Sequence, residues 1–320
     1  MTARHLISAV IGIGLLPFAA SDALADYPNR AITMVVPFAA GGGGDTFTRA
    51  IAEQAQERLG VNVLVENRVG GGATIGVGSV ARSAPDGYTI GFVSASPVVM
   101  ARNFSELPYE PATDLTYIAR FVTSPHPMMV PSGKPWQDFD ELVEWMRENP
   151  GRLRWSTAAV RGAPHVATEA LFDALGVEGT FIPMQGSSEV LAGLLGDTLD
   201  MGVISDFAVP MAAGDVRVIA ESGPERIAEL PDVPTYLDLG SPLAPSIFFG
   251  IAGPAGMPDD VVALWDEMIG EIVETERFQQ VAERLNANLA YLGNAEFHPM
   301  ILRDIEGMTE ALEALGMLDN

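Results

Sequence analysis

Short apolar runs alternate with amphipathic stretches along most of the chain, and glycine-rich or polar turns join them. The first run, residues 33–36, is apolar and β-branched, which predicts a buried strand that Pro37 ends. A turn of four glycines follows, Gly41, Gly42, Gly43 and Gly44. From Asp45 onward apolar residues recur at helical spacing, and Asp45 is suited to cap the first turn of that helix.

The same pattern repeats down the chain. Further strands are predicted at residues 61–65, 88–93, 153–157, 180–183, 201–204, 216–221 and 247–252, with a strand-like run interrupted by prolines at 117–130. Helices are predicted at residues 74–84, 138–148, 164–175, after Ser188, and at 258–274, 276–286 and 295–315. Strands that alternate with helices indicate an α/β fold with parallel βαβ units, in which ligands lie at the carboxyl ends of the strands.

The glycine turn is the first candidate binding site. Glycine carries no side chain to screen its N–H group, and the start of a helix adds the positive end of a dipole, so the turn suits an anion. The alternative is a loose connection without a ligand. Two nucleotide motifs do not fit: Thr46 stands where G-x-G-x-x-G needs its last glycine, and no Gly-Lys-Ser/Thr follows.

The N-terminus has the pattern of a secretory leader. A basic start precedes an apolar run at residues 6–20, and Ala23 and Ala25 form a small-x-small site. The sequence therefore predicts a signal peptide at residues 1–25 that is cleaved near Ala25, with an uncleaved anchor as the alternative. No later stretch approaches ~18 continuous apolar residues.

Size and charge narrow the function further. About 295 of the 320 residues remain after cleavage, which favours two lobes over one core. With 18 basic and 42 acidic residues the net charge is -24, a balance that repels nucleic acid. It repels anionic metabolites too, so a carboxylate ligand would need local compensation from backbone N–H groups or an arginine.

No catalytic or metal-binding pattern stands out. The chain has no cysteine and no G-x-S-x-G motif, and the three histidines after the predicted leader, His126, His165 and His298, lie far apart without ligand spacing. We therefore expect no catalytic residues, no metal and no cofactor. Scattered residues can converge in a fold, so a hydrolase or lyase acting on carboxylates stays open as an alternative.

Several motifs, in order, resemble one family. They are Tyr27-Pro28, Val36-Pro37-Phe38 before the glycine turn with Asp45, Val65-Glu66-Asn67-Arg68, Ala84-Pro85-Asp86-Gly87-Tyr88-Thr89, Leu107-Pro108-Tyr109, Leu230-Pro231-Asp232-Val233-Pro234-Thr235 and Gly253-Pro254-Ala255-Gly256. Together they look like the Bug, or TctC-type, periplasmic solute-binding proteins, over nearly the whole mature chain.

The resemblance implies a two-lobed α/β fold of the periplasmic-binding-protein type II ("Venus flytrap"), each lobe a mixed, mostly parallel sheet flanked by helices. Residues 26–124 with 248–320 would form the first lobe and residues 125–247 the second. Such a protein would be a periplasmic monomer that closes on a small carboxylate and delivers it to the membrane subunits of a tripartite tricarboxylate transporter. The alternative function is an extracytoplasmic ligand sensor for a membrane kinase, which would have the same two-lobed fold.

The resemblance also implies the ligand-binding residues. They are Phe38, Gly41, Gly42, Gly43, Gly44 and Asp45 in the first loop, Ser94 and Ser96 after the third strand, Thr157, Arg161 and His165 in the first loop of the second lobe, Gln185, Ser187 and Ser188 after the next strand, and Asp206. The loop at 156–165 departs from the family pattern, because Ala158, Ala159, Ala163 and Pro164 replace small polar residues.

Three of these residues admit two interpretations. Arg161 could pair with a second carboxylate, so that a dicarboxylate would bridge the glycine turn and Arg161, or it could be a solvated loop arginine. Asp206 could accept a hydrogen bond from a ligand hydroxyl, amine or protonated acid, or could cap a loop. His165 is expected to cap or pack at its helix start more than to contact ligand.

Overall fold

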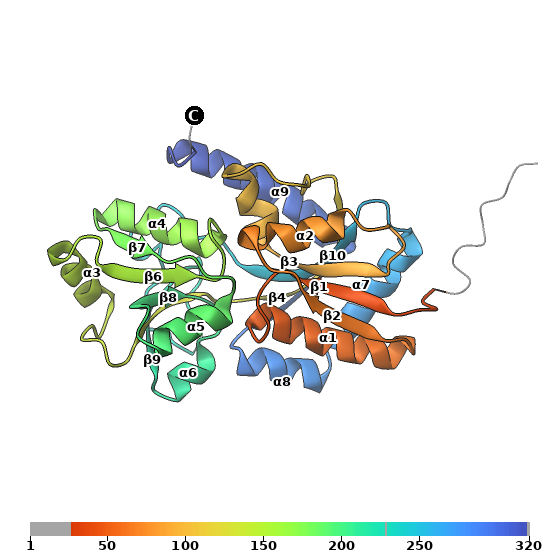
Figure 1. The fold of residues 1–320 in the computed structure, drawn as a ribbon, viewed down its shortest axis with the longest axis horizontal. Helices are drawn as coiled ribbons and strands as arrows, with labels where there is room; N and C mark the ends of the chain where they lie inside the picture. The colour runs from red at the N-terminus through yellow and green to blue at the C-terminus, as the bar shows by residue number, and fades with distance from the viewer. Residues whose placement is uncertain (1–26, 228, 319–320) are drawn as a thin grey trace, which may run out of the picture.

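Two mixed sheets, each flanked by helices, make up the computed structural model, which describes residues 27–227 and 229–318. The predicted signal peptide lies outside the described residues. We call the six-stranded sheet with its helices the first lobe and the five-stranded sheet with its helices the second lobe; they stand side by side in Figure 1.

The first lobe is built from both ends of the chain. In sheet order its strands are β11 (Asn288–Gly293), β4 (Leu115–Thr123), β10 (Phe248–Pro254), β3 (Thr89–Ser94), β1 (Ile32–Val36) and β2 (Val63–Asn67). Its helices are α1 (Gly43–Leu59), α2 (Thr74–Ala81), α7 (Asp259–Val273), α8 (Glu276–Arg284) and α9 (Asn294–Ala314), with the short helices η1 (Gly71–Ala73), η2 (Ser96–Met100) and η3 (Ala101–Asn103). Helices α1, α7 and α8 contact one another, and α2 lies across the sheet from α1 (Figure 1).

The second lobe repeats this plan. In sheet order its strands are β7 (Gly179–Phe181), β6 (Leu153–Thr157), β8 (Met201–Val203), β5 (Pro127–Pro131) and β9 (Val216–Glu221). Its helices are α3 (Phe139–Glu148), α4 (Ala163–Leu175), α5 (Ser187–Leu195) and α6 (Ala208–Ala212). Neighbouring residues of β5 face opposite cores, since Met128 packs with Trp155 while Met129 packs with Phe207, as the period of two along a strand requires.

The predicted mixed, mostly parallel sheets are confirmed. In the first lobe β1, β2, β3 and β4 run one way and β10 and β11 the other; in the second lobe only β5 opposes the rest. Both opposing central strands, β5 and β10, follow segments in which the chain crosses between lobes, at 124–126 and 222–247. The exact boundaries of the two lobes stay a prediction.

Glu221, at the end of β9, ties the two crossing segments together. Its Oε1 accepts hydrogen bonds from the backbone nitrogens of His126 at 3.1 Å and Gly223 at 2.9 Å. Burial raises the pKa of this carboxyl to about 7, against the opposing effect of those two bonds. A carboxyl that holds both crossing segments is therefore close to its titration point at neutral pH.

One predicted feature was wrong and one was incomplete. The chain between α8 and α9 was read without a strand, but residues 288–293 form β11 on β4. Leu289 and Tyr291 of this edge strand are 41% and 40% exposed, so it lacks the buried alternation that marks a strand in sequence. Residues 99–118, read as irregular, include the end of η2 and the whole of η3.

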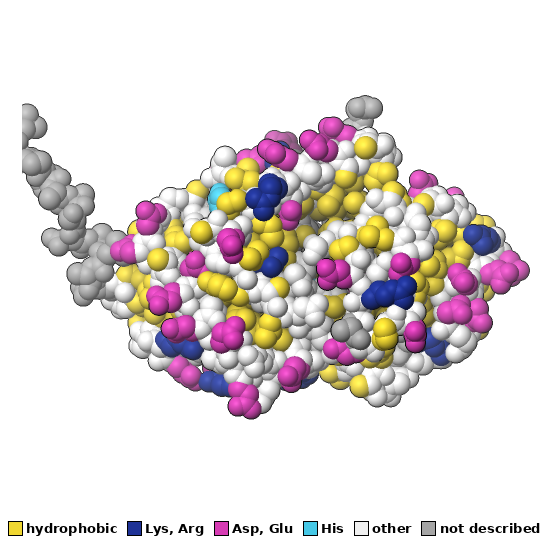
Figure 2. Space-filling model, turned by 180° about the vertical axis from the view of Figure 1, so that it is seen from behind, with side chains coloured by type: hydrophobic (Ala, Val, Ile, Leu, Met, Phe, Trp, Pro, Cys, Tyr) yellow, Lys and Arg dark blue, Asp and Glu magenta, His cyan; other side chains and the backbone are white. Residues whose placement is uncertain are grey.

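The outside of the molecule is acidic. The face in Figure 2 carries many separate Asp and Glu side chains and few Lys and Arg, as the net charge of -24 requires. No helix in the described ranges is both long and apolar enough to cross a membrane.

Candidate functional site

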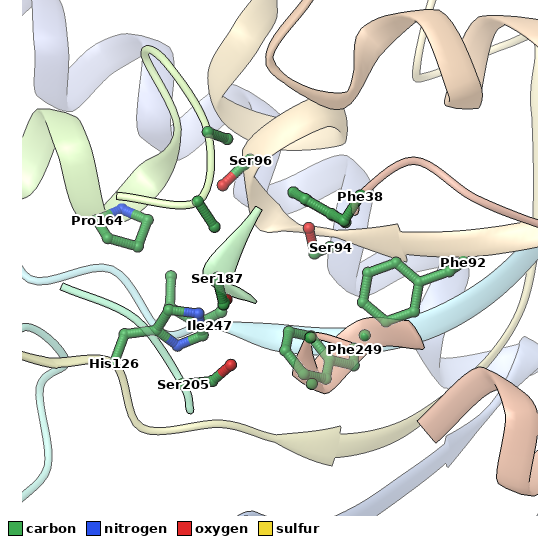
Figure 3. A pocket seen from close by; sticks show the side chains of 15 residues that line it. Phe38, Phe92, Ser94, Ser96, His126, Pro164, Ser187, Ser205, Ile247 and Phe249 are labelled. Atoms are coloured by element: carbon green, nitrogen blue, oxygen red, sulfur yellow. The ribbon is translucent and has the colours of Figure 1, made fainter. Parts of the chain in front are cut away.

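A small cavity between the two lobes is the candidate site (Figure 3). Its volume is about 40 Å³. The first lobe contributes Phe38, Gly42, Gly43, Gly44, Phe92, Ser94, Ser96 and Phe249, and the second contributes Ala158, Ala159, Pro164, Ser187 and Ser205, with His126 and Ile247 from the crossing segments. Most of these residues follow the carboxyl ends of the parallel strands β1, β3, β6 and β8, where open α/β sheets place their ligands.

The glycine turn forms one wall of the cavity. Helix α1 begins at Gly43, and its N-cap Gly42 has no side chain that could bond to the first turn. A methyl group at Gly44 would lie 3.0 Å from the Phe92 ring, and one at Gly43 would lie 2.9 Å from Ser205 Oγ. The absence of side chains therefore brings backbone N–H groups and the positive end of the α1 dipole directly to the cavity.

Asp45 stabilises this turn from behind. It does not cap the helix as predicted, because α1 begins two residues earlier and Asp45 lies inside the first turn. Its Oδ2 accepts bonds from the Gly41 nitrogen and from Arg49 Nε, both at 2.9 Å, and its Oδ1 accepts one from Asn67 Nδ2 at 2.9 Å. Asp45 and Gly41 thus pair with each other, and neither lines the cavity.

Three phenylalanines form an apolar wall beside the glycines. The Phe38 and Phe92 rings meet edge to face at a centroid distance of 5.9 Å, and Phe92 meets Phe249 at 5.0 Å. Ser94 and Ser96, both buried, follow on the same side. Ser96 Oγ accepts a hydrogen bond from the Ala163 nitrogen at 3.1 Å, so it already joins the lobes, and Ser94 also lines the cavity.

The wall from the second lobe is mostly apolar. Ala158, Ala159 and Pro164 face the cavity where the sequence had suggested lost hydroxyl contacts. The Thr157 side chain does not line it, because its hydroxyl donates to the Ala159 carbonyl at 2.9 Å and thereby shapes the loop. Ser187 supplies a hydroxyl at the uncapped N-terminus of α5.

Asp206 reaches across the cleft toward α1. The Gly43 nitrogen donates to Asp206 Oδ2 at 3.4 Å, and Ser205 Oγ donates to the same oxygen at 3.4 Å. Burial raises the pKa of the Asp206 carboxyl above its ordinary value, although hydrogen bonds from Ser187, Gly43 and Ser205 oppose that shift. The residue lies directly behind the cavity wall, and its charged form is disfavoured there.

Arg161 lies outside the cavity and is exposed. Its Nη1 donates to the carbonyl oxygen of Phe104 at 2.6 Å, and its guanidinium lies 5.6 Å from the Phe104 ring. Its own backbone is in the left-handed region, with φ of 53°. The side chain thus joins the second lobe to the first from an exposed position, as a loop arginine can.

The other three predicted residues also lie outside the cavity. His165 Nδ1 accepts from the Arg161 nitrogen at 2.7 Å, Nε2 lies 3.1 Å from Glu169 Oε1, and the ring stacks on Phe181. His165 therefore packs at its helix start, as expected. The Gln185 carbonyl accepts from the Ala39 nitrogen at 3.2 Å across the cleft, and Ser188 lies in the first turn of α5.

His126 is a cavity residue that the sequence did not reveal. Its Nδ1 lies 3.1 Å from the Ser124 carbonyl oxygen, which can only accept, so Nδ1 carries the proton and Nε2 is left as an acceptor. Burial lowers the pKa of this imidazole to about 4, so it is neutral at neutral pH. Phe92, Ile247 and Phe249 were missed as site residues because apolar strand residues read as core, which they also are.

The two lobes are in contact around this cavity. Besides the bonds of Ser96, Arg161, Gln185 and Asp206, a methyl group at Gly186 would lie only 2.9 Å from the Ala39 nitrogen. The cleft is therefore closed. Among the described residues no group of three or more His, Cys, Asp or Glu side chains could hold a metal ion.

Comparison with known proteins gives a consistent result. The profile described as "Tripartite tricarboxylate transporter family receptor" matches residues 47–307. Protein BugT of Bordetella pertussis is 30% identical over 84% of both chains. Among solved structures, the periplasmic binding protein BugD has a TM-score of 0.83 at 29% identity, over 92% of this chain and 100% of BugD. MatC from Rhodopseudomonas palustris, solved with bound malate, has a TM-score of 0.82 at 26% identity, over 89% of this chain and 100% of MatC.

Proposed function

The chain belongs to the TctC family of tripartite tricarboxylate transporter receptors, and on that basis we propose that it captures a small carboxylate between its lobes and delivers it to a membrane transporter. The resemblance read from the motifs is thus confirmed, as is the type II binding-protein fold. The family consists of solute-binding proteins and not of enzymes, so capture and release are the activity to explain.

The N-terminus of α1, which faces the cavity between the lobes through Gly42, Gly43 and Gly44, is the observation that carries the proposal. A helix N-terminus without side chains suits a carboxylate, because its N–H groups and dipole offer positive charge that the acidic exterior does not. The malate bound in MatC supports an acid as the ligand.

The residues that contact the carboxylate in this proposal are those of the predicted set that line the cavity: Phe38, Gly42, Gly43, Gly44, Ser94, Ser96 and Ser187. Gly41 and Asp45 hold the turn in place, and Thr157 and His165 hold the facing loop. Arg161, Gln185 and Asp206 hold the closed cleft from the second lobe.

Closure is a hinge movement of residues 26–124 with 248–320 against residues 125–247, about the two crossing segments. It removes water from around the carboxylate and strengthens each hydrogen bond by lowering the local dielectric. In this proposal the chain works as a monomer in the periplasm, after cleavage near Ala25, and meets the membrane subunits of a tripartite tricarboxylate transporter when closed. The receptor family and the periplasmic relatives support this assignment.

Isothermal titration calorimetry with a panel of carboxylic acids tests the capture step. Gly42→Ala is the sharpest variant, since Gly42 has an ordinary backbone conformation and a methyl group there would have no neighbour closer than 3.7 Å. The fold should therefore be unaffected, while the methyl group narrows access to the glycine N–H groups. The matched control is Gly133→Ala, where nothing lies within 4 Å.

Weaker binding of the cognate acid by Gly42→Ala alone is the expected result. Equal affinity in both variants, or binding of no acid by the parent protein, would contradict the proposal. Transport is tested by uptake of the bound acid in cells with and without the gene.

A further inference from the structure

We propose that a groove behind the glycine turn docks an apolar, acidic extracytoplasmic segment of the transporter's membrane subunit while the lobes are closed. This inference rests on the proposed function, because it assigns a surface to the membrane partner that the receptor family implies. Four observations support it: the groove is built from both lobes, it shares a wall with the ligand cavity, it is apolar, and the arginine at its edge has no acidic partner.

The groove lies where α5 and α6 of the second lobe meet α1 and α8 of the first, along the lower side of the molecule in Figure 1. Its volume is about 350 Å³. Thr46 and Leu285 line it from the first lobe, and Leu191, Leu195 and Val209 line it from the second. Because opening the lobes would separate these two sets, the complete groove is a property of the closed conformation.

The groove and the ligand cavity share one wall. Residues 42–44 line the cavity, whereas Gly41 and Thr46, on either side of them in the chain, line the groove. Asp206 also lines the groove, and its Oδ2 accepts a hydrogen bond from the Gly43 nitrogen at 3.4 Å across the cleft. Capture of a solute at the glycine turn and docking of a partner in the groove therefore act on the same contact between the lobes.

The groove is apolar although the exterior of the protein is acidic. Leu195 at the end of α5 is 54% exposed, and Val209 on α6 is 60% exposed, the highest value for a large hydrophobic side chain among the described residues. Leu191 and Leu285 line the groove beside them. Exposed apolar side chains that border a groove are typical of a surface that another protein covers.

The charged groups at the edge of the groove indicate what that protein carries. Arg284 comes from the first lobe and Asp215 from the second, and both are exposed. Neither takes part in an ion pair among the described residues. An arginine without an acidic partner beside an apolar groove favours a docking segment that brings a carboxylate next to apolar side chains.

The overall charge argues against a second copy of this chain as the occupant. Two molecules that each carry a net charge of -24 repel one another. A membrane subunit is the partner that the receptor family itself implies. A groove that is complete only in the closed conformation lets that subunit distinguish the closed receptor from the open one.

Site-directed cross-linking tests the docking. The chain contains no cysteine, so Val209→Cys places a single thiol in the groove. Leu237→Cys places one at a similarly exposed position, 50%, in the second lobe outside the groove. Each variant is labelled with benzophenone maleimide and illuminated with inner-membrane vesicles of the source cells, with and without the acid that binds most tightly in calorimetry. Mass spectrometry identifies the cross-linked protein.

The expected result is a cross-link from Val209→Cys, and not from Leu237→Cys, to a membrane subunit of the transporter. Its yield should rise about threefold or more with the acid, because the acid shifts the population toward the closed conformation. No such cross-link from Val209→Cys, or equal yields from the two variants, would overturn the inference. A cross-link to a second copy would assign the groove to self-association and would overturn it as well.

The same assay tests the charge of the docking segment. Arg284→Glu in the Val209→Cys background should lower the yield about threefold or more, because it places a carboxylate against an acidic segment. Arg147→Glu, at an exposed position of α3, is the matched control and should leave the yield unchanged. Equal yields in the two variants would overturn the assignment of an acidic segment.

Uptake by cells separates this inference from the proposed function. Leu195→Glu should bind the acid as the parent does in calorimetry, because Leu195 does not line the cavity, while uptake falls about tenfold or more. Leu64→Glu, at a 55% exposed leucine of β2, should change neither. Full uptake with Leu195→Glu would overturn the inference and leave capture intact. Binding of no acid by the parent would contradict capture, and the cross-link without acid would still decide the role of the groove.

Discussion

The guanidinium of Arg161 in the second lobe donates a 2.6 Å hydrogen bond to the carbonyl oxygen of Phe104 in the first. The bond crosses the cleft at its edge, outside the cavity. In the hinge movement proposed above, opening the lobes would break this bond, so we expect it to stabilise the closed conformation without touching the solute.

Arg161→Ala should therefore weaken binding of every acid by a similar factor, about two- to tenfold, since an exposed charged hydrogen bond contributes about 1 kcal/mol. The loss should appear as faster release, measured by stopped-flow fluorescence of Trp155, which lies 5.2 Å from the His165 ring in the same region. Arg147→Ala on α3 is the control. A loss of affinity confined to dicarboxylates would indicate instead that Arg161 contacts the ligand directly.

Gly186→Ala tests closure itself. Gly186 has φ of 166°, an extended backbone that alanine also adopts, but its methyl group would lie 2.9 Å from the Ala39 nitrogen. The second lobe should fold normally and fail to close fully. We expect lower affinity and a larger radius of gyration by small-angle X-ray scattering at saturating acid, compared with the parent and with Gly133→Ala. A radius of gyration equal to that of the parent would show that the close approach of Gly186 to Ala39 is not needed for closure.

The raised pKa of Asp206 predicts that ligand affinity depends on pH. An anion beside Asp206 raises the pKa of its carboxyl further above the ordinary 3.8, so binding takes up a proton. Affinity should fall as the pH rises through that raised pKa, and Asp206→Asn should remove the fall while keeping an acceptor for the Gly43 nitrogen. Calorimetry between pH 5 and 8 in buffers of different ionisation enthalpy measures the proton uptake, with Asp140→Asn as the control. An unchanged pH profile in Asp206→Asn would exclude this coupling.

The raised pKa of Glu221 predicts that the free energy of unfolding depends on pH. Its pKa is 4.5 in the unfolded reference and about 7 in the fold, so the folded state binds the extra proton between these values. The stabilisation is complete below pH 4.5 and is lost as the pH rises to about 7, with a total on the order of 3 kcal/mol. Glu221→Gln keeps an acceptor for His126 and Gly223 and should abolish this loss.

Chemical denaturation between pH 4.5 and 8.5 checks the prediction as a difference between parent and variant. The control is Glu225→Gln, an exposed neighbour. Groups that face the hinge besides Glu221 are His126, Tyr236, Arg226 and Arg120. Parallel pH curves for Glu221→Gln and the parent would assign the dependence to one of those groups.

Local pattern was sufficient to predict the strand, glycine turn and helix at residues 32–59, because each of these features depends on residues close in sequence. It was insufficient for β11, which is a strand because it pairs with β4, a partner about 170 positions earlier. The antiparallel direction of β5 and β10 likewise depends on how the chain crosses between the lobes, and no local sequence pattern indicates it.

The same distinction between local and distant contacts applies to the residues of the site. Phe38, Ser94 and Ser187 were placed correctly beside the cavity because they follow strand ends, which gather at one edge of each sheet. His126 and Phe249 were missed because they come from a crossing segment and from a strand that returns from the other lobe. The contact of Arg161 could not be predicted, because its partner, the carbonyl of Phe104, is a backbone atom 57 residues away in the sequence.

Strand β10 lies between β3 and β4 in the middle of the first sheet, although it follows the whole second lobe in the chain. During synthesis the N-terminal sheet thus stays split between β3 and β4 until residue 254 has left the ribosome. A nascent chain that has made four-fifths of its length still cannot complete its first hydrophobic core. The interleaved topology therefore couples completion of the first core to synthesis of the segment that follows the whole second lobe.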